Sequence, residues 1–284
     1  MSAIPSLRPS PIAGTWYESN PQKLARSIDA YLDQAKLPAL PGAVVAVIAP
    51  HAGHVYSGAV AGYAFAAVRG LRPELVALLS PMHHYYTQPL LTTAHGAYVT
   101  PLGEIPVDLT AVSDLDARLR RQLGFGLTPV SNDPEHSLEI ELPFLQRAVK
   151  SDFHLLPVML RIHDADVSRQ VGEALAETLR GKNALLVAST DLSHFYDQAT
   201  ANRLDSALLE QVQAFSPEGV FDVESQGKGE ACGIAALTAV LWAAKALGAD
   251  TVKVLNHATS GDVTGDFRRV VGYGAAVVLK SGAK

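Results

Sequence analysis

The stretch Ala43-Val-Val-Ala-Val-Ile-Ala-Pro-His-Ala-Gly-His-Val-Tyr-Ser-Gly58 decides the fold of this chain. Its first seven residues form a continuous apolar run, which is typical of a strand covered on both faces of a sheet. Pro50 ends the run, and His51 follows where the backbone turns toward a small-residue helix predicted at 59–68. Ligands of open α/β sheets bind beyond the carboxyl ends of the strands, so His51 is a candidate for chemistry. A histidine that only caps the turn is the alternative.

Two further apolar strands end in the same way. The strand predicted at 74–80 is followed by proline and then by His83 and His84, and the strand predicted at 183–189 is followed by Asp191 and His194. The spacing does not choose between His83 and His84. Parallel strands bring their carboxyl ends to one edge of a sheet, so we expect these side chains to converge there.

Strands and helices alternate along the rest of the chain, which predicts one α/β domain over residues 1–284 with a mostly parallel or mixed central sheet and helices on both faces. Residues 1–20 are expected to form an ordered arm, 88–107 short strands beside the main sheet, and 216–229 a polar connection. Pro143 is expected to kink or break a helix near 136–146. Further strands are predicted at 154–160, 251–257 and 269–279, and helices at 21–37, 108–123, 165–179, 198–215 and 232–248.

Composition excludes several classes of protein. The 284 residues are 48% hydrophobic and 18% charged, with a formal net charge of -5, so no basic surface indicates nucleic-acid binding. No signal peptide or membrane-spanning segment is predicted, because Pro50 and the histidines interrupt the long uncharged stretch at 43–68. We therefore expect a cytoplasmic protein. Cys232 is the single cysteine, which excludes a disulfide within the chain.

Cys232 is a third kind of candidate ligand. Neutral imidazole with a carboxylate or a thiolate is an ordinary ligand set, so the residues that follow the strands, together with Cys232, predict a metal or acid–base site. Cys232 stands at the start of a predicted helix, where the first backbone amides favour the thiolate. A free cysteine beside Ala231 and Gly233 is alternatively a small buried hydrophobe.

Acid–base chemistry is predicted for Asp191 and His194, because imidazole titrates near neutral pH and the two residues stand three positions apart. Asp191 could instead cap the following turn. His136 lies in a polar cluster with Glu135 and Glu139, and we predict that it faces the substrate. Phosphate-cradling loops, nucleophile elbows and dinucleotide fingerprints do not occur in the sequence.

Eight motifs in order along nearly the whole chain resemble the Memo family, whose bacterial and archaeal members are called AmmeMemoRadiSam system protein B. These motifs are Ala13-Gly-Thr-Trp-Tyr17, Ala49-Pro-His-Ala-Gly53, Ser80-Pro-Met-His-His84, Thr100-Pro-Leu-Gly103, Glu135-His-Ser-Leu-Glu139 with Leu142-Pro-Phe144, Ser189-Thr-Asp-Leu-Ser-His194, Cys232-Gly233 and Val270-Val-Gly-Tyr273.

That family is similar in fold to class III extradiol ring-cleaving dioxygenases, which hold non-haem Fe(II) on two histidines and a glutamate. The resemblance implies His51, His83 and Cys232 as metal ligands, with Asp191 and His194 as catalytic residues in the same pocket. It selects His83, and we predict that His84 and His54 contact the substrate. The sequence departs from the usual family pattern at His54, commonly tyrosine, and at Met82, commonly serine.

The resemblance implies an iron-dependent oxidoreductase of extradiol type that acts on a small, catechol-like substrate. Fe(II) is the expected cofactor, and Cu or Zn are alternatives because thiolate is a softer ligand than carboxylate. A non-catalytic metal-binding or partner-binding protein is the second hypothesis, and zinc-assisted hydrolysis is a third. By family association, the expected partners are a radical-SAM protein and AmmeMemoRadiSam system protein A.

Overall fold

A mixed β-sheet runs through the computed structural model, which describes residues 6–282. Among these residues, nine strands form the sheet in the order β10-β12-β2-β9-β3-β8-β4-β7, with β11 also paired to β12. Strands β2, β9, β3 and β8 are parallel, whereas β12 runs antiparallel to β2 and β4 antiparallel to β8. The strands are β2 Ala43–Ala49, β3 Leu75–Pro81, β4 Leu90–Thr93, β7 Thr128–Val130, β8 His154–Leu160, β9 Ala184–Ser189, β10 His194–Tyr196, β11 Thr251–Thr259 and β12 Val270–Lys280.

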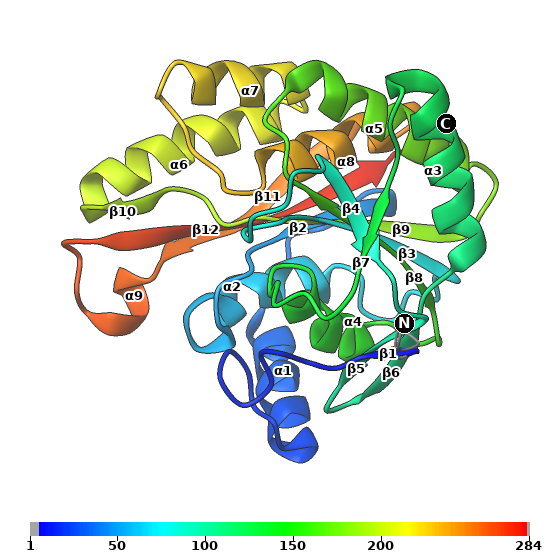
Figure 1. Cartoon of the computed structure of the whole chain (residues 1–284). Helices are drawn as coiled ribbons and strands as arrows, with labels where there is room; N and C mark the ends of the chain where they lie inside the picture. Colours follow the sequence, from blue (N-terminus) through cyan, green and yellow to red (C-terminus); the bar gives the residue numbers. More distant parts are fainter. Residues whose placement is uncertain (1–5, 283–284) are drawn as a thin grey trace.

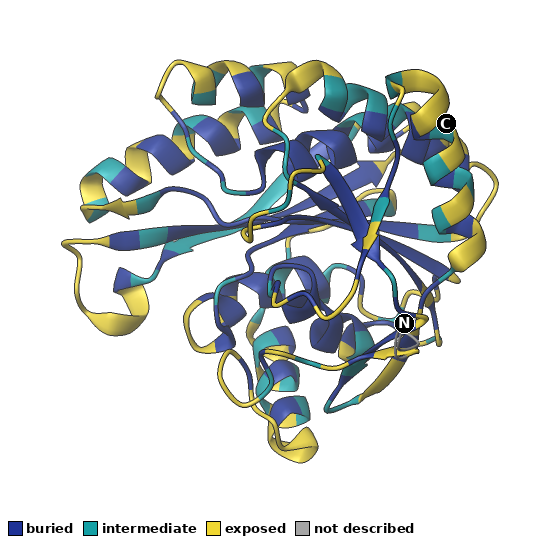
Figure 2. Cartoon of the chain, in the orientation of Figure 1, coloured by how far each residue is buried: buried dark blue, intermediate teal, exposed yellow. Residues whose placement is uncertain are grey.

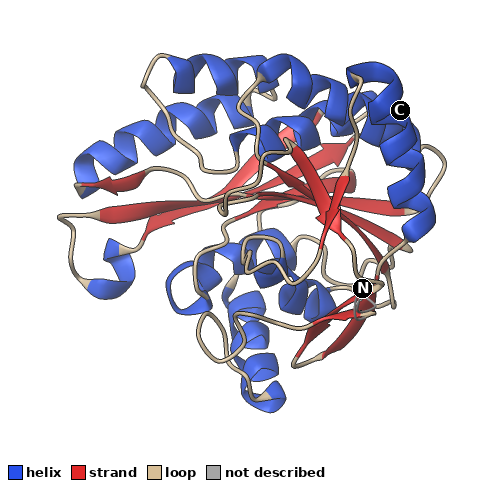
Figure 3. Ribbon diagram, in the orientation of Figure 1, coloured by secondary structure: helices blue, strands red, loops and turns tan. Residues whose placement is uncertain are grey.

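Helices cover both faces of this sheet (Figures 1 and 3). One face carries α3 Leu109–Leu123, α5 Ala165–Leu179, α6 Gln198–Gln213, α7 Pro217–Ser225 and α8 Ile234–Ala246. The other face carries α1 Pro21–Gln34, α2 His54–Ala66, the 3-10 turn η1 Glu139–Glu141, α4 Leu142–Ala148 and a small sheet of β1 Leu7–Arg8, β5 Ala97–Thr100 and β6 Gly103–Pro106. The predicted α/β fold with helices on both faces is confirmed.

Two hydrophobic cores flank the central strands, because successive side chains of a strand point to opposite faces. In β3, Ala77 and Leu79 pack into the core beneath α5 and α8, whereas Val76 and Leu78 pack into the core beneath α2 and α4. Every residue of β3 is buried, and the centre of the sheet is buried along its length (Figure 2). This double burial explains why the central strands have continuous apolar sequences.

Helix α2 approaches α1 closely enough to require glycine. A Cβ atom on Gly62 would lie 2.6 Å from the backbone oxygen of Tyr31, and one on Gly58 would lie 2.5 Å from the Tyr31 ring. The two glycines therefore allow α1 to pack directly on α2, which begins three residues after His51. The predicted helix at 59–68 is thus correct in kind but starts earlier, at His54.

Three other predictions need correction. The segment 216–229 contains α7, whose N-cap Ser216 accepts a hydrogen bond from Gly219 and whose first turn holds Pro217, where proline is tolerated. Pro143 does not kink a helix, because it lies in the first turn of α4, directly after η1. Of the short strands at 88–107, β5 and β6 form the predicted hairpin beside the main sheet, but β4 belongs to the main sheet.

No helix within residues 6–282 combines the length and the apolar character that crossing a membrane requires. At the opposite end of the sheet from β7, α9 Gly261–Thr264 connects the long strands β11 and β12, which project beyond the helical layers (Figure 1). This projection forms one wall of the larger cavity described below.

Candidate metal centre

Three histidines from separate parts of the chain meet at the carboxyl edge of the sheet. His51 follows β2, His83 follows β3, and His136 lies in the loop between β7 and η1. Each offers one ring nitrogen, and these three nitrogens all lie within 4.8 Å of one another. The rings of His83 and His136 are stacked with centroids 4.7 Å apart, and both lie edge-on to His51. The predicted convergence of His51 and His83 therefore occurs, while His84 is exposed.

Glu135 orients His83. Its Oε1 accepts a hydrogen bond from Nδ1 of His83 at 2.9 Å, and its Oε2 accepts from the His83 backbone amide at 2.5 Å. Burial would raise the pKa of Glu135, but its hydrogen bond from His83 and the nearby imidazole charges bring that pKa below its usual range. Because Nδ1 carries the proton, Nε2 of His83 keeps a lone pair for a metal ion.

His136 lies beneath the indole of Trp16, with ring centroids 4.0 Å apart and planes inclined by 29°. Burial lowers the pKa of His136 to about 4, although the Glu135 carboxylate opposes this shift. His51 is only 1% exposed, and burial followed by the proximity of His83 lowers its pKa well below the ordinary value. Both imidazoles are therefore neutral at physiological pH, which is the form that binds metals.

Cys232 reaches the same place from the segment before α8. Its Sγ lies 3.1 Å from Nε2 of His51 and 3.7 Å from the backbone oxygen of Asp191. A Cβ atom on Gly233 would lie 2.6 Å from the Ser189 backbone oxygen, so glycine lets the cysteine segment approach the end of β9. Two ligands of one tetrahedral ion would lie roughly 3.5 Å apart, so Sγ and Nε2 have a spacing that one ion can bridge.

The expected thiolate character of Cys232 is wrong for the metal-free protein. Burial raises the pKa of the Cys232 thiol far above its usual range, and the nearby Asp191 carboxylate raises it further. Helix α8 begins at Ile234 rather than at the cysteine, so the first helical amides do not outweigh these effects. A bound metal ion would have to displace the thiol proton.

Asp191 holds the turn that carries His51. Its Oδ1 accepts hydrogen bonds from the backbone amides of His51 at 2.7 Å and Ala52 at 3.3 Å. Burial raises the pKa of Asp191 to about 7, and these two hydrogen bonds limit the rise. Asp191 therefore caps the turn that follows β2 rather than the turn that follows Asp191 itself, and a direct catalytic role for Asp191 stays a prediction.

His194 begins the short edge strand β10. Its Nδ1 donates to the backbone oxygen of Leu192 at 2.7 Å, and Glu230 lies 3.7 Å from the same nitrogen. Its side chain is 27% exposed, and the other nitrogen, Nε2, takes no part in this hydrogen bond. A catalytic role for His194 is consistent with this tautomer and stays a prediction.

His54 points into the core rather than toward the histidine cluster. Its Nε2 donates to the backbone oxygen of Ile140 at 3.1 Å, its ring contacts Phe144 and Tyr17, and its Nδ1 is buried without a partner. Burial lowers its pKa to about 4. His54 lines a smaller cavity beneath the N-terminal arm, and its contact with substrate stays a prediction.

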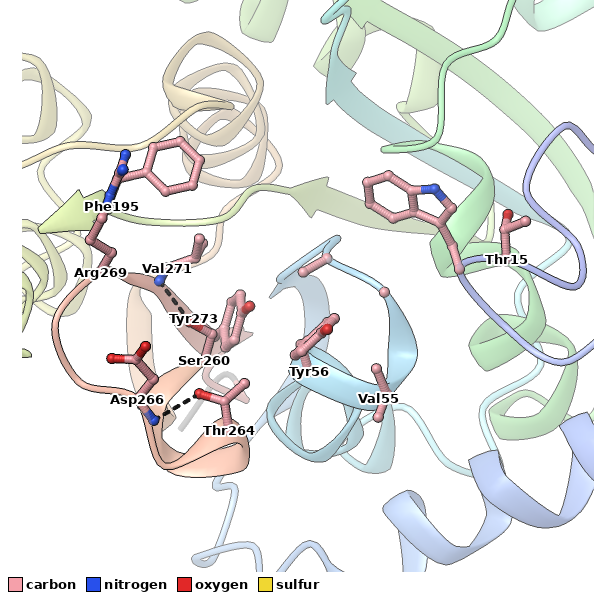
Figure 4. Close-up of a pocket in the computed structure, with 13 residues that line it drawn as sticks. Thr15, Val55, Tyr56, Phe195, Ser260, Thr264, Asp266, Arg269, Val271 and Tyr273 are labelled. Carbon is pink, nitrogen blue, oxygen red and sulfur yellow. Dashed lines mark hydrogen bonds between the residues drawn. The ribbon is translucent and has the colours of Figure 1, made fainter.

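A cavity with a volume of about 610 Å³ lies beside the cluster. Tyr56 and Tyr273 lie at its centre, and Phe195 and Arg269 lie together at one end (Figure 4). Trp16 lines this cavity and also stacks on His136, so one ring separates the cavity from the cluster. None of the three clustered histidines lines it.

Sequence reasoning missed some of this site. His136 was expected to face substrate but shares the histidine cluster, because the three-residue strand β7 that precedes its loop is too short to show in the apolar pattern. Phe195 has a positive φ of 66° within an irregular β10–β12 pairing, which no residue pattern indicates. Glu135 was seen only as part of a polar cluster, although a carboxylate next to a ligand candidate is a usable signal.

Comparison with known proteins identifies relatives along almost the whole chain. A family model described as "Memo-like protein" matches residues 8–277. A MEMO1 family protein of Nitrosopumilus maritimus is 35% identical over 232 residues, which are 82% of this chain and 83% of that protein. MEMO1 family proteins of Methanopyrus kandleri and Thermotoga neapolitana are each 34% identical and cover 95% and 96% of this chain, and 98% and 99% of their own lengths.

Proposed function

The chain belongs to the Memo family, and from that premise and the geometry of the histidine cluster we propose that it is a non-haem metal-dependent oxidoreductase. The proposed substrate is a small phenolic, catechol-like molecule, and the proposed metal is Fe(II). The observation that carries the proposal is the meeting of three imidazole donors from distant segments within 4.8 Å. Side chains brought together at this spacing are what a single metal ion requires.

The donor set fits a metal of this class. His51, His83 and His136 form the set of donors whose ligand atoms lie within 4.8 Å of one another, and Cys232, 3.1 Å from His51, is a further candidate ligand. Two imidazoles with one anionic ligand suit Fe(II) and leave coordination positions open, while a thiolate also suits Cu(I) or Zn(II). When bound, Fe(II) would supply the redox chemistry that cleavage of a catechol ring by dioxygen needs.

The surrounding side chains would position the substrate and move its proton. Tyr56, Tyr273 and Phe195 give the neighbouring cavity aromatic walls that suit a planar ring. The Nε2 of His194 is available as a base for a phenolic proton, because its Nδ1 proton is held by the Leu192 backbone oxygen. Trp16 would shield the cluster from bulk water on the cavity side.

The test uses protein purified without oxygen. Its metal content is measured first, and the metal-free protein is then loaded with Fe(II), Zn(II) or Cu(I) in parallel. We expect oxygen uptake with at least one catechol or phenol in the Fe(II) sample, lost in His194→Gln while metal content is kept. Absence of turnover with every metal and every phenol would rule out the oxidoreductase.

One observation favours the second function, a non-catalytic metal-binding or partner-binding protein on a dioxygenase scaffold. The cavity of about 610 Å³ is lined by none of the clustered histidines, so the pocket and the metal site need not act together. Bound metal without redox activity in the experiment above would support this function. The proposed partners, a radical-SAM protein and AmmeMemoRadiSam system protein A, and the proposed cytoplasmic location rest on the family association, and affinity capture of these two partners would test them.

A further inference from the structure

Ser189, the last residue of β9, lies at the meeting point of three buried polar groups. Its Oγ is 3.0 Å from Nδ1 of His51, 2.6 Å from the backbone oxygen of Ser137 and 2.8 Å from Oε1 of Glu141. Ser189 and Glu141 are at most 1% exposed, so water does not compete for these contacts. A hydroxyl group has one proton and two lone pairs, so it can donate to one of these partners and accept from the other two.

The direction of each hydrogen bond follows from the chemistry of the partners. A backbone carbonyl can only accept, so the Ser189 proton goes to Ser137. His51 must then donate from Nδ1, and the Glu141 carboxyl group must donate as well. A carboxyl group can donate only when it is protonated.

The surroundings of Glu141 favour the same state. Among the described residues, no arginine, lysine or histidine forms an ion pair with Glu141, and the neighbouring ionisable group is the carboxylate of Asp191. Burial raises the pKa of Glu141 well above its ordinary value, and Asp191 adds to the rise while the contact with Ser189 opposes it. An ionised carboxylate here would be buried without a counter-charge, which is costly.

We propose that Glu141 is a neutral carboxylic acid that donates to Ser189, and that Ser189, whose own proton goes to Ser137, accepts from His51 and so holds it as the tautomer with its proton on Nδ1. Nε2 of His51 then carries the lone pair on the side of Cys232, where the metal would sit. If Glu141 were ionised, it would draw the hydroxyl proton toward itself and leave the Ser137 carbonyl 2.6 Å from the Ser189 oxygen with no proton between them. Ser189 is thus a positioning residue, and its effect on metal affinity rests on the proposed function.

The protonation state and the tautomer can both be read in the metal-free protein. We expect infrared spectra at pH 8.5, above the pKa of about 7 for Asp191, to show a carboxylic acid C=O band that shifts in D2O and disappears in Glu141→Gln. Nitrogen-15 NMR of histidine-labelled protein should show His51 protonated at Nδ1. The proposal would be overturned if no acid band disappeared in Glu141→Gln, or if His51 carried its proton on Nε2.

Three variants test the positioning role. Glu141→Gln keeps a donor of the same size, so the Nδ1 proton should stay and metal affinity should change by less than about threefold. Ser189→Ala removes the acceptor of the Nδ1 proton, so it should mix the two tautomers and lower metal affinity by about 10- to 100-fold. Glu141→Leu removes only the second donor to Ser189, so the Nδ1 proton should stay. Circular dichroism checks that each variant is folded.

The outcomes separate this proposal from the metal-site proposal. An acid band and an Nδ1 proton in a wild-type protein that binds no metal would support the state of Glu141 and remove the proposed function. Normal metal binding without the acid band would support the metal site and remove the proposed state of Glu141. An unchanged tautomer in Ser189→Ala would show that Ser189 does not position His51.

Discussion

Trp16 covers His136, with the two ring centroids 4.0 Å apart, so the N-terminal arm closes one side of the histidine cluster. The same arm carries Arg8, which lies beneath the loop of His136 and binds Asp133 and Glu139. One segment near the start of the chain therefore contacts the cluster through Trp16 and the loop of His136 through Arg8. The ordered arm that the sequence predicts near the start of the chain therefore forms part of the site.

Replacement of Trp16 should change the acidity of His136. Burial lowers the pKa of His136 to about 4, so removal of the indole in Trp16→Ala should hydrate the imidazole and raise its pKa toward 6.5. Trp16→Phe keeps a stacked ring and should give a smaller rise. NMR titration of the metal-free protein measures both values, and an unchanged pKa in Trp16→Ala would show that the indole does not shield His136.

Metal binding should depend on His51 and His83 and should identify the third ligand. His51→Ala and His83→Ala should each reduce bound metal sharply, because each removes one of the few donors. Of His136→Ala and Cys232→Ser, only one is expected to reduce bound metal to the same extent, and that variant identifies the third ligand. His84→Ala is the matched control, since His84 is the exposed neighbour of His83. Full metal occupancy in both His51→Ala and His83→Ala would exclude the site.

Loss of Arg8 should destabilise the fold strongly. Its guanidinium lies 2.8 Å from Asp133 and 2.5 Å from Glu139, and the side chains of all three residues are at most 2% exposed. Arg8→Met leaves two buried carboxylates without their cation, which should lower the free energy of unfolding by about 3–5 kcal/mol. Urea denaturation measures the change.

Arg69→Met is the matched control for Arg8. The Arg69–Asp33 ion pair has a comparable distance of 2.7 Å, but its side chains are 48% and 64% exposed. Water screens this pair, so its loss should cost no more than about 1 kcal/mol. Equal effects of the two variants would contradict the importance assigned to the buried pair.

His54 should make stability fall in mild acid. Burial lowers its pKa from 6.5 to about 4 in the folded chain, so between these values the unfolded chain binds the extra proton and the folded chain does not. Stability therefore rises with pH across this window and is lost as pH falls from 6.5 to 4, by about 3 kcal/mol in total. Unfolding free energies measured between pH 4 and 7 test this slope.

His54→Phe should reduce that slope and leave the part contributed by His51 and His136, whose pKa values burial also lowers. The variant also removes the hydrogen bond to Ile140 and lowers stability at every pH. A slope in His54→Phe equal to that of the wild type would assign the acid sensitivity to other groups.

The central strands could be predicted from the sequence because both of their faces are buried. The predicted bounds at 43–49 and 154–160 are those of β2 and β8, and the helix at 165–179 is α5. Continuous apolar runs and amphipathic spacing are local signals, so they can be recognised without knowledge of the fold. Helix α7 was missed because its sequence is polar and its cap and first-turn proline also suit a loop.

The placement of His51 and of the His83–His84 pair followed from the sequence for a similar reason, and the family resemblance selected His83. Each residue comes directly after a buried parallel strand, and the pairing of β2 with β9 and of β9 with β3 puts both strand ends at one edge. His136 and Trp16 follow no long strand. Their positions depend on how the loop after β7 folds against the N-terminal arm, more than a hundred residues away in sequence.

The sequence by itself determined the α/β class, the central strands and the histidines at their ends. Burial on both faces and the turn after each strand depend on neighbouring residues, so a local pattern indicates them. Only the tertiary structure decided that His136 joins them, that burial keeps the Cys232 thiol protonated, and that Ser189 meets His51, Ser137 and Glu141. Hydrogen-bond direction and desolvation depend on which distant groups share a space from which water is excluded, and no local pattern of residues specifies that.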